Sequence, residues 1–364
     1  MLGAIMLALV VAVGCSVGGG PHPPPRHGPS DAAVEQSPKT IGFAETLAGV
    51  QKEIAGYRGL VPGGLVLVRQ GTRHRVVTWG FADTARQTPI TADSRFPVGS
   101  ITKTFVTVRA LQLVEEGRLR LGDTVEKWLP GLLPAGDQAT VGQLLSHRAG
   151  LGDAVDRAAD WPIDADWTRS DLHRALMAAG RPGIRTDYSN VGFILAGLVV
   201  EQAGGQPLER QLADHVFAPA GMDQTTLSTD PIENSRLVRG YDHRGRDVTP
   251  NDLSGAWAAG GAVSSARDLD RFLTALFSYR LLDEPTVADM TDPRGDLGSA
   301  ASYALGLLVY HFDCGDAFGH DGALPGYRTG LLHNPAGDRS MVLVVNTEND
   351  LGALAFVGKA ALCP

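Results

Sequence analysis

Two polar residues stand three positions apart where an apolar segment begins, in the stretch 95–117 (RFPVGSITKTFVTVRALQLVEEG). If this segment is helical, Ser100 and Lys103 share one face, because residues i and i+3 are neighbours on a helix. The apolar residues Phe105 and Val108 predict that the helix is buried. Burial disfavours a charged lysine, and a lysine that gives up its proton can act as a base toward a serine. The pair is therefore either an ordinary helix start with a solvated lysine or a nucleophile with its proton acceptor.

A phenol and an amide follow in the stretch 186–197 (TDYSNVGFILAG), where Tyr188 and Asn190 precede another apolar helical pattern. A loop that ends in a helix cap would have the same composition. Beside a lysine, however, a phenol can be held as a phenolate, and a phenolate can take a proton from a serine. The Tyr-x-Asn pattern therefore indicates chemistry only in combination with Ser100 and Lys103.

A glycine-rich segment lies near the C-terminal end, in the stretch 318–330 (FGHDGALPGYRTG). The glycines that flank His320 indicate that the backbone approaches another group closely. The edge of a strand beside a nucleophile can donate backbone N–H groups to an oxyanion. This segment is therefore a candidate for the stabilisation of charge in a transition state.

In this order, the three segments resemble the serine β-lactamase and D-alanyl-D-alanine carboxypeptidase superfamily, most closely its carboxypeptidase, class C and esterase branch. The resemblance runs from about residue 43 to the end of the chain and includes LVEEGRLRLGDTVEKWLPG, TVGQLLSHRAGL, VFAPAGMDQT and AAGGAVSSARDL. It implies an α+β fold of the β-lactamase/transpeptidase type for residues 41–364. Strand patterns at both ends of this region indicate one antiparallel sheet flanked by helices, with a mainly helical insertion at roughly 118–260.

The resemblance also implies a role for each residue that matches the first two motifs. Ser100 matches the acylated nucleophile, and Lys103 matches its proton partner. Tyr188 matches the general base that also protonates the leaving group. Asn190 matches the residue that orients Lys103 and the substrate amide.

The third motif departs from the pattern of the family. His320, Asp321 and Gly322 stand where the family usually has Lys/His-Thr/Ser-Gly, and the backbone N–H groups of Ser100 and Ala323 would form the oxyanion hole. The missing hydroxyl helps to hold a substrate carboxylate, and an aspartate in its place would repel an anion unless it were protonated or turned away. This departure favours neutral esters or amides over penicillin-like and D-Ala-D-Ala-like substrates.

These observations predict an exported serine hydrolase that acts through an acyl-enzyme on Ser100. The first candidate is a D-alanyl-D-alanine carboxypeptidase-like peptidase, the second an esterase on small acyl esters, and the third a β-lactamase. A cell-surface binding lipoprotein with an idle site is the alternative outside the enzymes. We expect no cofactor, no metal, a monomer, and a small-molecule or peptide substrate with an ester or amide carbonyl. The net charge of −8 over 364 residues argues against a nucleic-acid partner.

The first 40 residues have the composition of a leader and a tether. Residues 1–17 include an uninterrupted apolar run and Cys15, which predicts a signal peptide whose cysteine is lipidated as in a bacterial lipoprotein. A cleaved secretory signal and an uncleaved anchor are the alternatives. Residues 18–40 are rich in Gly and Pro and predict a disordered tether. The protein is thus expected at the cell surface or secreted, with membrane contact only through its N-terminal lipid or leader.

Two further cysteines, Cys314 and Cys363, lie in the region that is expected to fold. Export to an oxidising compartment predicts that they pair, and two free buried thiols are the alternative. His147 in LLSHRAGL is interpreted as a residue that fixes a loop, because buried polar groups mostly serve structure. No set of His, Cys or Asp residues in the sequence has the spacing of metal ligands.

Overall fold

The computed structural model describes residues 42–133, 138–151, 188–227, 237–298, 300–349 and 352–363. Residues Thr40–Pro364 form one compact unit. The predicted leader 1–17, with Cys15, and the predicted tether 18–40 lie outside the described residues. A helical pattern at 170–180 in the expected insertion also lies outside them.

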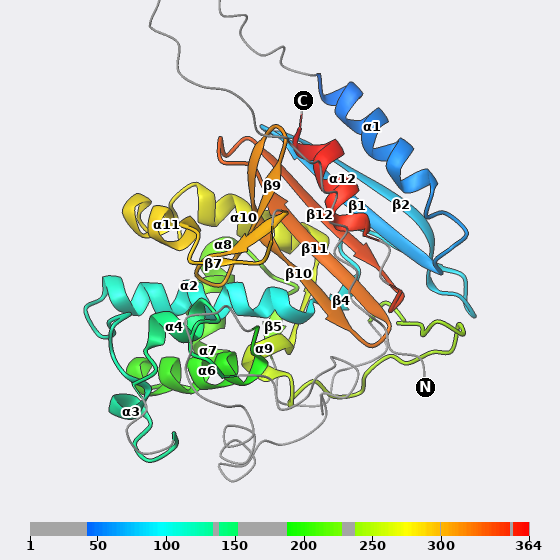
Figure 1. Cartoon of the computed structure of the whole chain (residues 1–364). Coiled ribbons are helices and arrows are strands. Elements are labelled where there is room, and N and C mark those ends of the chain that lie inside the picture. The colour runs from blue at the N-terminus through cyan, green and yellow to red at the C-terminus, as the bar shows by residue number, and fades with distance from the viewer. Residues whose placement is uncertain are drawn as a thin grey trace, which may run out of the picture. The chain divides into compact units, whose positions relative to one another are not determined.

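The main sheet draws its strands from both ends of the chain, as predicted (Figure 1). In the described residues it has nine strands in the order β3-β2-β1-β12-β11-β10-β9-β8-β7, and every neighbouring pair is antiparallel. The pairing of β1 with β12, in which Leu65 stands opposite Val344, joins the two ends. The strands are β1 (Gly63–Gln70), β2 (Arg73–Asp83), β3 (Thr88–Pro89), β7 (Gly295–Asp296), β8 (Ala301–Tyr303), β9 (Leu308–Phe312), β10 (Gly315–Leu324), β11 (Tyr327–His333) and β12 (Arg339–Val345).

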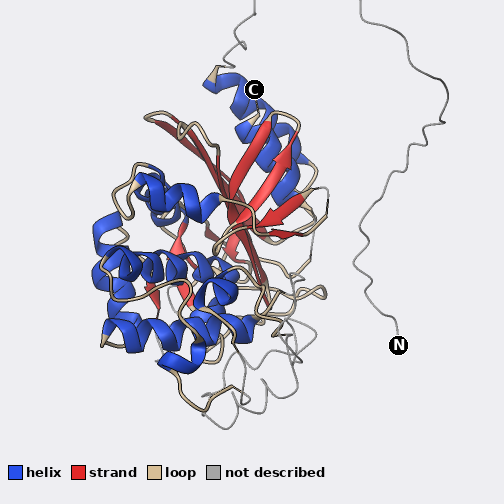
Figure 2. Ribbon diagram, turned by 60° about the vertical axis from the view of Figure 1, so that its left-hand side comes forward, coloured by secondary structure: helices blue, strands red, loops and turns tan. Residues whose placement is uncertain are grey.

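Helices cover both faces of this sheet, which explains why its central strands are apolar without alternation. In β1 the run Leu65 to Val68 is buried at every position. The helices α1 (Phe43–Ala55) and α12 (Ala353–Leu362) lie on one face, and α10 (Ala266–Phe277) lies on the other (Figure 2). Cys314, in the turn between β9 and β10, forms a disulfide with Cys363 at the end of α12, with an S–S distance of 2.05 Å.

The helix α2 (Thr102–Glu115) is the centre of the helical region. Eleven of its residues are buried, including both polar and apolar side chains, so it is enclosed on all sides. The other described helices around it are α3 (Val125–Trp128), α4 (Val141–Leu145), α6 (Asn190–Gly204), α7 (Leu208–Leu212), η3 (Ala213–Phe217), α8 (Ala218–Ala220), α9 (Trp257–Gly260) and α11 (Glu284–Thr291). All of these except α11 fall within the range predicted for the helical insertion.

A small second sheet positions the start of α2. It has the order β4-β6-β5, with β4 (Arg95–Pro97), β6 (Ala262–Ser265) and β5 (Thr226–Leu227). Its strand β4 leads directly into the short 3-10 turn η1 (Gly99–Ile101), which continues as α2. Beyond β4, the Val98 N–H donates to Ala262 O at 2.9 Å, so the chain enters η1 from a fixed position.

Candidate active site

Ser100 lies in the turn η1, which packs against the strand β10. Gly99 adopts a φ of +57°, and a Cβ atom there would stand only 3.0 Å from the backbone nitrogen of Ala323. Glycine is therefore required both for the backbone conformation and for the close approach of β10. Thr102 fixes the turn from the other side, because its hydroxyl donates to Gly99 O at 2.8 Å and accepts from Ala262 N–H at 3.1 Å.

Lys103 is completely buried one turn after Ser100. Its ammonium nitrogen donates to Ser100 Oγ at 3.0 Å, to Asn190 Oδ1 at 2.7 Å and to Ala259 O at 2.7 Å. Asn190 is the first residue of α6 and Ala259 belongs to α9, so three helices converge on one amine. An amide oxygen and a peptide oxygen can only accept, which directs two N–H bonds of Lys103 away from the serine. The remaining position on the nitrogen faces Ser100 Oγ, where it can give or take a proton.

The ring of Tyr188 contacts both Lys103 and His147. Lys103 Nζ lies 4.8 Å from the centroid of the phenol ring, and the His147 imidazole lies 4.2 Å from it with the planes tilted by 33°. The Tyr188 side chain is 39% exposed, so a substrate can reach it. The favourable contact of a cation with an aromatic face holds this ring beside the amine.

His147 is buried two residues after the end of α4, and its imidazole is held in the neutral form. Its Nδ1 accepts the backbone N–H of Ser189 at 3.0 Å, which places the proton on Nε2. Desolvation, followed by the positive charge of Lys103 and the nearby His320, holds the pKa of His147 well below its usual range. His147 thus fixes the chain at Ser189, in line with the loop-fixing role predicted for it, and its ring also packs on Tyr188.

Tyr303 and His320 form a second buried pair beside this cluster. The Tyr303 hydroxyl lies 3.0 Å from His320 Nε2, and His320 Nδ1 lies 2.6 Å from the backbone oxygen of Asp321. Because a carbonyl oxygen can only accept, Nδ1 carries a proton, and Nε2 forms its hydrogen bond with the phenol. Burial, with the neighbouring Tyr188 and Asp321, raises the pKa of Tyr303 well above its usual value. Both nitrogens of His320 are thus satisfied by protein groups, and its side chain has no exposed surface.

Asp321 lies at the border of this cluster with solvent. Its side chain is 58% exposed, and its Oδ1 lies 3.5 Å from His320 Nδ1. Desolvation tends to raise the pKa of Asp321, but the interactions with His320 and the positive charge of Lys103 lower it overall. Asp321 is therefore a carboxylate at neutral pH, and its charge interacts with the cluster around Ser100.

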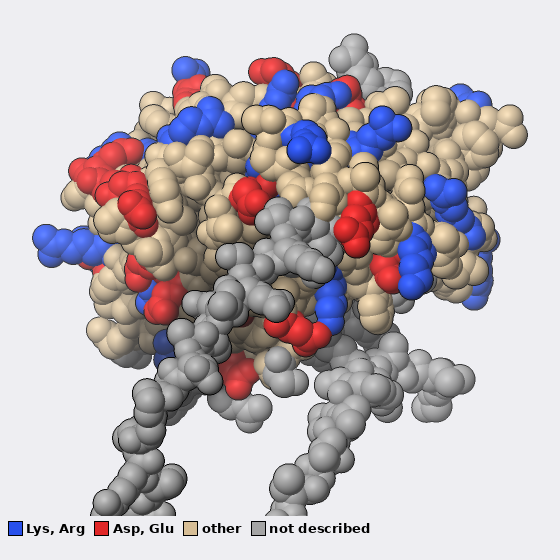
Figure 3. All heavy atoms as spheres, turned by 90° about the horizontal axis from the view of Figure 1, so that it is seen from above, with Lys and Arg blue, Asp and Glu red and all other residues tan. Residues whose placement is uncertain are grey.

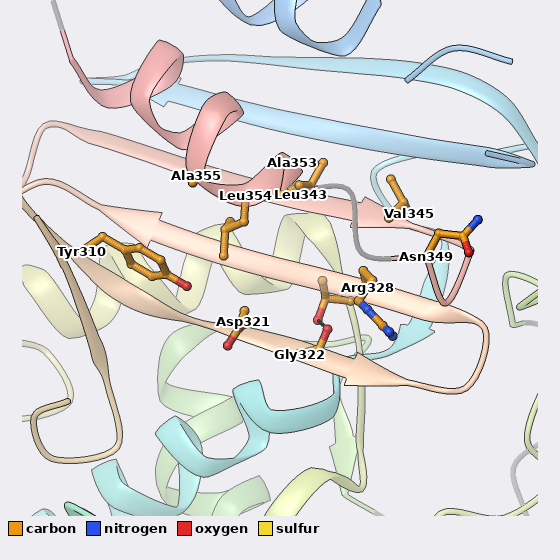
Figure 4. Close-up of a pocket in the computed structure, with 12 residues that line it drawn as sticks. Tyr310, Asp321, Gly322, Arg328, Leu343, Val345, Asn349, Ala353, Leu354 and Ala355 are labelled. Atoms are coloured by element: carbon orange, nitrogen blue, oxygen red, sulfur yellow. Dashed lines mark hydrogen bonds between the residues drawn. The ribbon is translucent and has the colours of Figure 1, made fainter. Parts of the chain in front are cut away.

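A pocket of about 200 Å³ adjoins the third motif on the α12 side of the sheet (Figure 4). Asp321 and Gly322 contribute to it from β10, Tyr310 from β9 and Leu354 from α12, and Figure 4 shows the Tyr310 and Leu354 side chains directed toward it. Arg328 lines it from β11, where its Nη1 donates to the backbone oxygen of Tyr327 at 2.9 Å. The pocket therefore lies beside the third motif and does not itself contain Ser100.

The structure brings the first two predicted motifs together directly, because Lys103 touches both Ser100 and Asn190. The sequence did not point to Ala259, because its contact with Lys103 is made by the backbone oxygen, which every residue type has. It also missed Tyr303, which stands in an apolar segment (SYALG) without a recognisable pattern. Its distance of 17 residues from His320 is bridged only when β8, β9 and β10 pair.

No group of three or more His, Cys, Asp or Glu side chains in the described residues is placed to hold a metal ion. Within the same residues, no helix combines the length and the apolar character needed to span a bilayer. On the face seen in Figure 3, acidic and basic side chains are interspersed.

Known proteins show the same sequence pattern and fold. The family model described as Beta-lactamase matches residues 43–360. Penicillin-binding protein 4* of Bacillus subtilis is 27% identical over 78% of this chain and 68% of its own length. The D-aminopeptidase of Brucella anthropi is 30% identical over 82% of this chain, which spans 58% of that protein. The structure of the D-amino acid amidase of Ochrobactrum anthropi SV3 with D-phenylalanine has a TM-score of 0.77 and 28% identity, and covers 86% of this chain and 98% of that one.

These matches confirm the fold that the three motifs predicted, an antiparallel sheet flanked by helices in the β-lactamase/transpeptidase arrangement. The family model covers most of the chain, including every residue of the three motifs. The chain therefore belongs to the Beta-lactamase family, and it is a serine hydrolase related to penicillin-binding proteins and D-aminopeptidases.

Proposed function

We propose that this serine hydrolase forms an acyl-enzyme on Ser100 and acts on D-amino-acid peptides or amides. The observation that carries the proposal is the 3.0 Å contact between Lys103 Nζ and Ser100 Oγ, with the amine held by Asn190 and Ala259. A nucleophile and base at hydrogen-bond distance, with the base oriented by a third group, is the arrangement that covalent catalysis requires.

In the first step, Ser100 attacks the substrate carbonyl while the Lys103–Tyr188 pair accepts its proton. The backbone N–H groups of Ser100 and Ala323 stabilise the oxyanion, and the close packing of Gly99 against Ala323 supports this assignment. Tyr188, which is exposed to substrate, returns the proton to the leaving group as the C–N or C–O bond breaks. Water then attacks the acyl-enzyme and regenerates Ser100 with the same groups in reverse.

The substrate class is proposed from the relatives and from Asp321. One relative is a D-aminopeptidase and one structural neighbour is a D-amino acid amidase in complex with D-phenylalanine. Asp321 stands where the family usually has a hydroxyl residue that helps to hold a substrate carboxylate, so the carboxylates of D-Ala-D-Ala peptides and of penicillins lack that partner here. The carboxypeptidase that the sequence placed first is therefore replaced as the leading candidate by an amidase or aminopeptidase. Ester hydrolysis remains the second candidate, because an acyl-enzyme site accepts small neutral esters.

The experiment compares kcat/KM for four substrates in the wild-type protein and in Ser100→Ala. The substrates are D-alanine p-nitroanilide, its L-enantiomer, p-nitrophenyl acetate and benzylpenicillin. We expect hydrolysis of the D-anilide in preference to the L-anilide, and a loss of at least about a thousandfold in Ser100→Ala with the melting temperature unchanged. Turnover of p-nitrophenyl acetate alone would favour the esterase, and turnover of benzylpenicillin would show that the hydroxyl replaced by Asp321 is not needed to hold a substrate carboxylate. Unchanged activity in Ser100→Ala would remove Ser100 as the nucleophile.

We also propose that the protein is exported, acts at the cell surface or as a secreted protein, and is a monomer. The apolar run and Cys15 at the N-terminus support export, and so does the disulfide between Cys314 and Cys363, because disulfides persist in oxidising compartments. The mass of the N-terminal peptide from the native host separates the three possible processing events. A diacylated Cys15 would identify a lipoprotein, and an intact leader in the cytoplasmic fraction would contradict export.

A further inference from the structure

We propose that Glu209 is a positioning residue that acts on Lys103 through Trp257. Glu209 belongs to α7, and Trp257 is the first residue of α9, the helix whose Ala259 O accepts a hydrogen bond from Lys103. The inference rests on the proposed function, because it concerns the amine that is proposed to exchange a proton with Ser100. It adds a residue outside the three motifs to the groups that hold this amine in place.

The first step of the argument is that the contact of Lys103 with Ala259 O depends on the backbone of α9. This helix is a single turn, Trp257–Gly260, and the Gly261 N–H closes it by donating to Trp257 O at 2.7 Å. The turn is tight, because a Cβ atom at Gly261 would stand only 2.8 Å from Trp257 N. Ala259 lies within the turn, so the backbone of Trp257 helps to set the direction of the carbonyl that faces Lys103.

The second step is that Trp257 has an unfavourable backbone conformation. Its φ angle is +28°, which a bulky side chain rarely adopts because its Cβ atom crowds the backbone. A residue keeps such a conformation only where the surrounding contacts hold it there. The position of the Ala259 carbonyl therefore depends on the groups that bind the Trp257 side chain.

The third step is the environment of the indole ring. Its Nε1–H donates to Glu209 Oε1 at 2.5 Å, and both side chains are half-buried, which partly shields this charge-assisted bond from water. The ring also fits closely against α6, because a Cβ atom at Gly197 would stand 3.0 Å from Trp257 Cζ3 and 2.6 Å from Ala258 Cβ. The same helix α6 begins with Asn190, the second acceptor of Lys103.

These contacts connect a carboxylate on α7 with the amine beside the nucleophile. If Glu209 no longer holds the indole, the backbone of Trp257 can relax to an ordinary conformation and turn Ala259 O away from Lys103. The amine would then lose one of the two acceptors that direct it toward Ser100 Oγ. We therefore expect a loss of Glu209 to slow the reaction of Ser100 rather than to weaken the binding of substrate.

The experiment measures the rate at which a fluorophosphonate labels Ser100, by intact mass spectrometry and without any choice of substrate. Glu209→Leu removes the acceptor and Trp257→Phe removes the donor, and each is expected to lower this rate about tenfold. Glu209→Gln is expected to stay within about threefold of the wild-type rate, because its amide oxygen can still accept the indole N–H. In steady-state kinetics, kcat should fall in Glu209→Leu while KM stays within about twofold.

A double variant separates an effect on Lys103 from a general effect on the structure. In the Lys103→Met background, Glu209→Leu is expected to change the labelling rate by less than about twofold, because no amine is left to position. A further fall of about tenfold in that background would show that Glu209 does not act through Lys103, and it would overturn the inference.

Asp123→Leu is the matched control, because the Asp123 carboxylate accepts the indole N–H of Trp128 at 3.2 Å. Trp128 lies on α3, outside the three helices that converge on Lys103, so this variant should label within about twofold of the wild-type rate. Equal slowing in Asp123→Leu and Glu209→Leu would overturn the inference.

The same labelling rates distinguish a failure of this inference from a failure of the proposed function. A wild-type rate in either Glu209→Leu or Trp257→Phe, together with slow labelling of Lys103→Met, would remove the role of Glu209 alone. A wild-type rate in Lys103→Met would remove the proposed role of Lys103 and the role of Glu209 with it.

Discussion

Two cationic side chains are buried on the same helix, α2, and they are surrounded in different ways. Lys103 has no exposed surface and Arg109 is 1% exposed. Arg109 donates to a carboxylate oxygen of Glu116 at 2.7 Å and to Gln211 Oε1 at 3.0 Å. Lys103 donates to the oxygens of an alcohol, a side-chain amide and a peptide.

The same helix thus holds one cation that serves stability and another that serves chemistry. A guanidinium keeps its proton in proteins, so Arg109 can bind Glu116 at the end of α2 and Gln211 on α7 without taking part in proton transfer. An amine that touches uncharged oxygens can be stabilised with or without its proton, and one of those oxygens belongs to Ser100. The first arrangement is expected to matter for stability and the second for catalysis.

The largest effect is expected from Lys103→Met, which removes the amine and retains a chain of similar length. We expect kcat/KM to fall by about a hundredfold to ten-thousandfold, because the proton acceptor for Ser100 is lost. The cost of leaving Asn190 Oδ1 and Ala259 O without this donor is offset by the removal of a buried cation, so the melting temperature is expected to change little. Kinetics and calorimetry on the same preparation test the loss of activity and the unchanged melting temperature. Activity near that of the wild type would refute the role of Lys103 as the proton acceptor.

Arg109→Met is the matched variant and is expected to give the opposite pattern. The free energy of unfolding should fall by about 2 kcal/mol, because Gln211 loses its donor and the packing around the helix is disturbed. The loss of the ion pair itself contributes little of this, since the Glu116 side chain is 37% exposed and can be hydrated. Chemical denaturation measures the stability, and kcat/KM is expected to stay within about twofold of the wild-type value. A large loss of kcat/KM in the folded variant would contradict the expectation that Arg109 serves stability and not catalysis.

Unlike the two buried cations on α2, the buried side chain of His333 is kept neutral. It has no exposed surface and stacks on Phe277 at 4.1 Å, and desolvation is the main cause that lowers its pKa to about 4. Between pH 6.5 and about 4 the unfolded chain binds a proton that the folded protein does not, so stability is lost as the pH falls through this window. From pH 6.5 to pH 5 the loss is expected to be roughly 2 kcal/mol.

The variant His333→Phe retains the aromatic stack and removes the titrating group. Its free energy of unfolding should therefore depend less steeply on pH between 6.5 and 5 than that of the wild type. His74→Phe, which changes an exposed histidine on β2, is the control and should keep the wild-type slope. Equal slopes in all three proteins would show that His333 is not the group that titrates.

The smallest effect is expected at His147, which contacts Tyr188 and does not itself transfer a proton. His147→Phe retains a ring against Tyr188 but removes the acceptor of the Ser189 N–H, so we expect kcat to fall about tenfold with little change in KM. Ser189→Ala keeps that N–H and removes only the hydroxyl that caps α6. It should cost about 1 kcal/mol of stability and leave kcat unchanged. Equal kcat values in both variants would contradict a positioning role for His147.

The local parts of the fold and of the site could be predicted from the sequence. The apolar pattern around Ser100 and Lys103 predicts a buried helix with both side chains on one face, and the structure has both features. The strand patterns at the two chain ends predict the sheet that joins β1 with β12. These features depend on residues close in sequence or on a pattern repeated along a whole strand.

The parts that could not be predicted depend on contacts between distant residues. The spacing of Ser265 and Asp268 in the sequence is that of a variant capping box, and Ser265 does cap α10 by accepting the Asp268 N–H. The Asp268 carboxylate does not complete a capping box, however, because it accepts from Gln224 N–H at 2.7 Å and Thr225 Oγ1 at 2.9 Å. The Asp268 carboxylate thus accepts from two donors that are distant in the sequence in place of the backbone N–H of Ser265. The pairing of Tyr303 with His320 could not be foreseen for the same reason.

The most direct test of the role of Ser100 is intact mass spectrometry after reaction with a fluorophosphonate, which traps an activated serine. The wild-type protein is expected to gain the mass of one phosphonyl group, and peptide mapping should place it on Ser100. Lys103→Met should react far more slowly, Arg109→Met at nearly the wild-type rate, and Ser100→Ala should remain unlabelled at that position. Labelling of Ser100 at an equal rate in Lys103→Met and the wild type, or labelling of a different serine, would contradict the proposal that Lys103 activates Ser100.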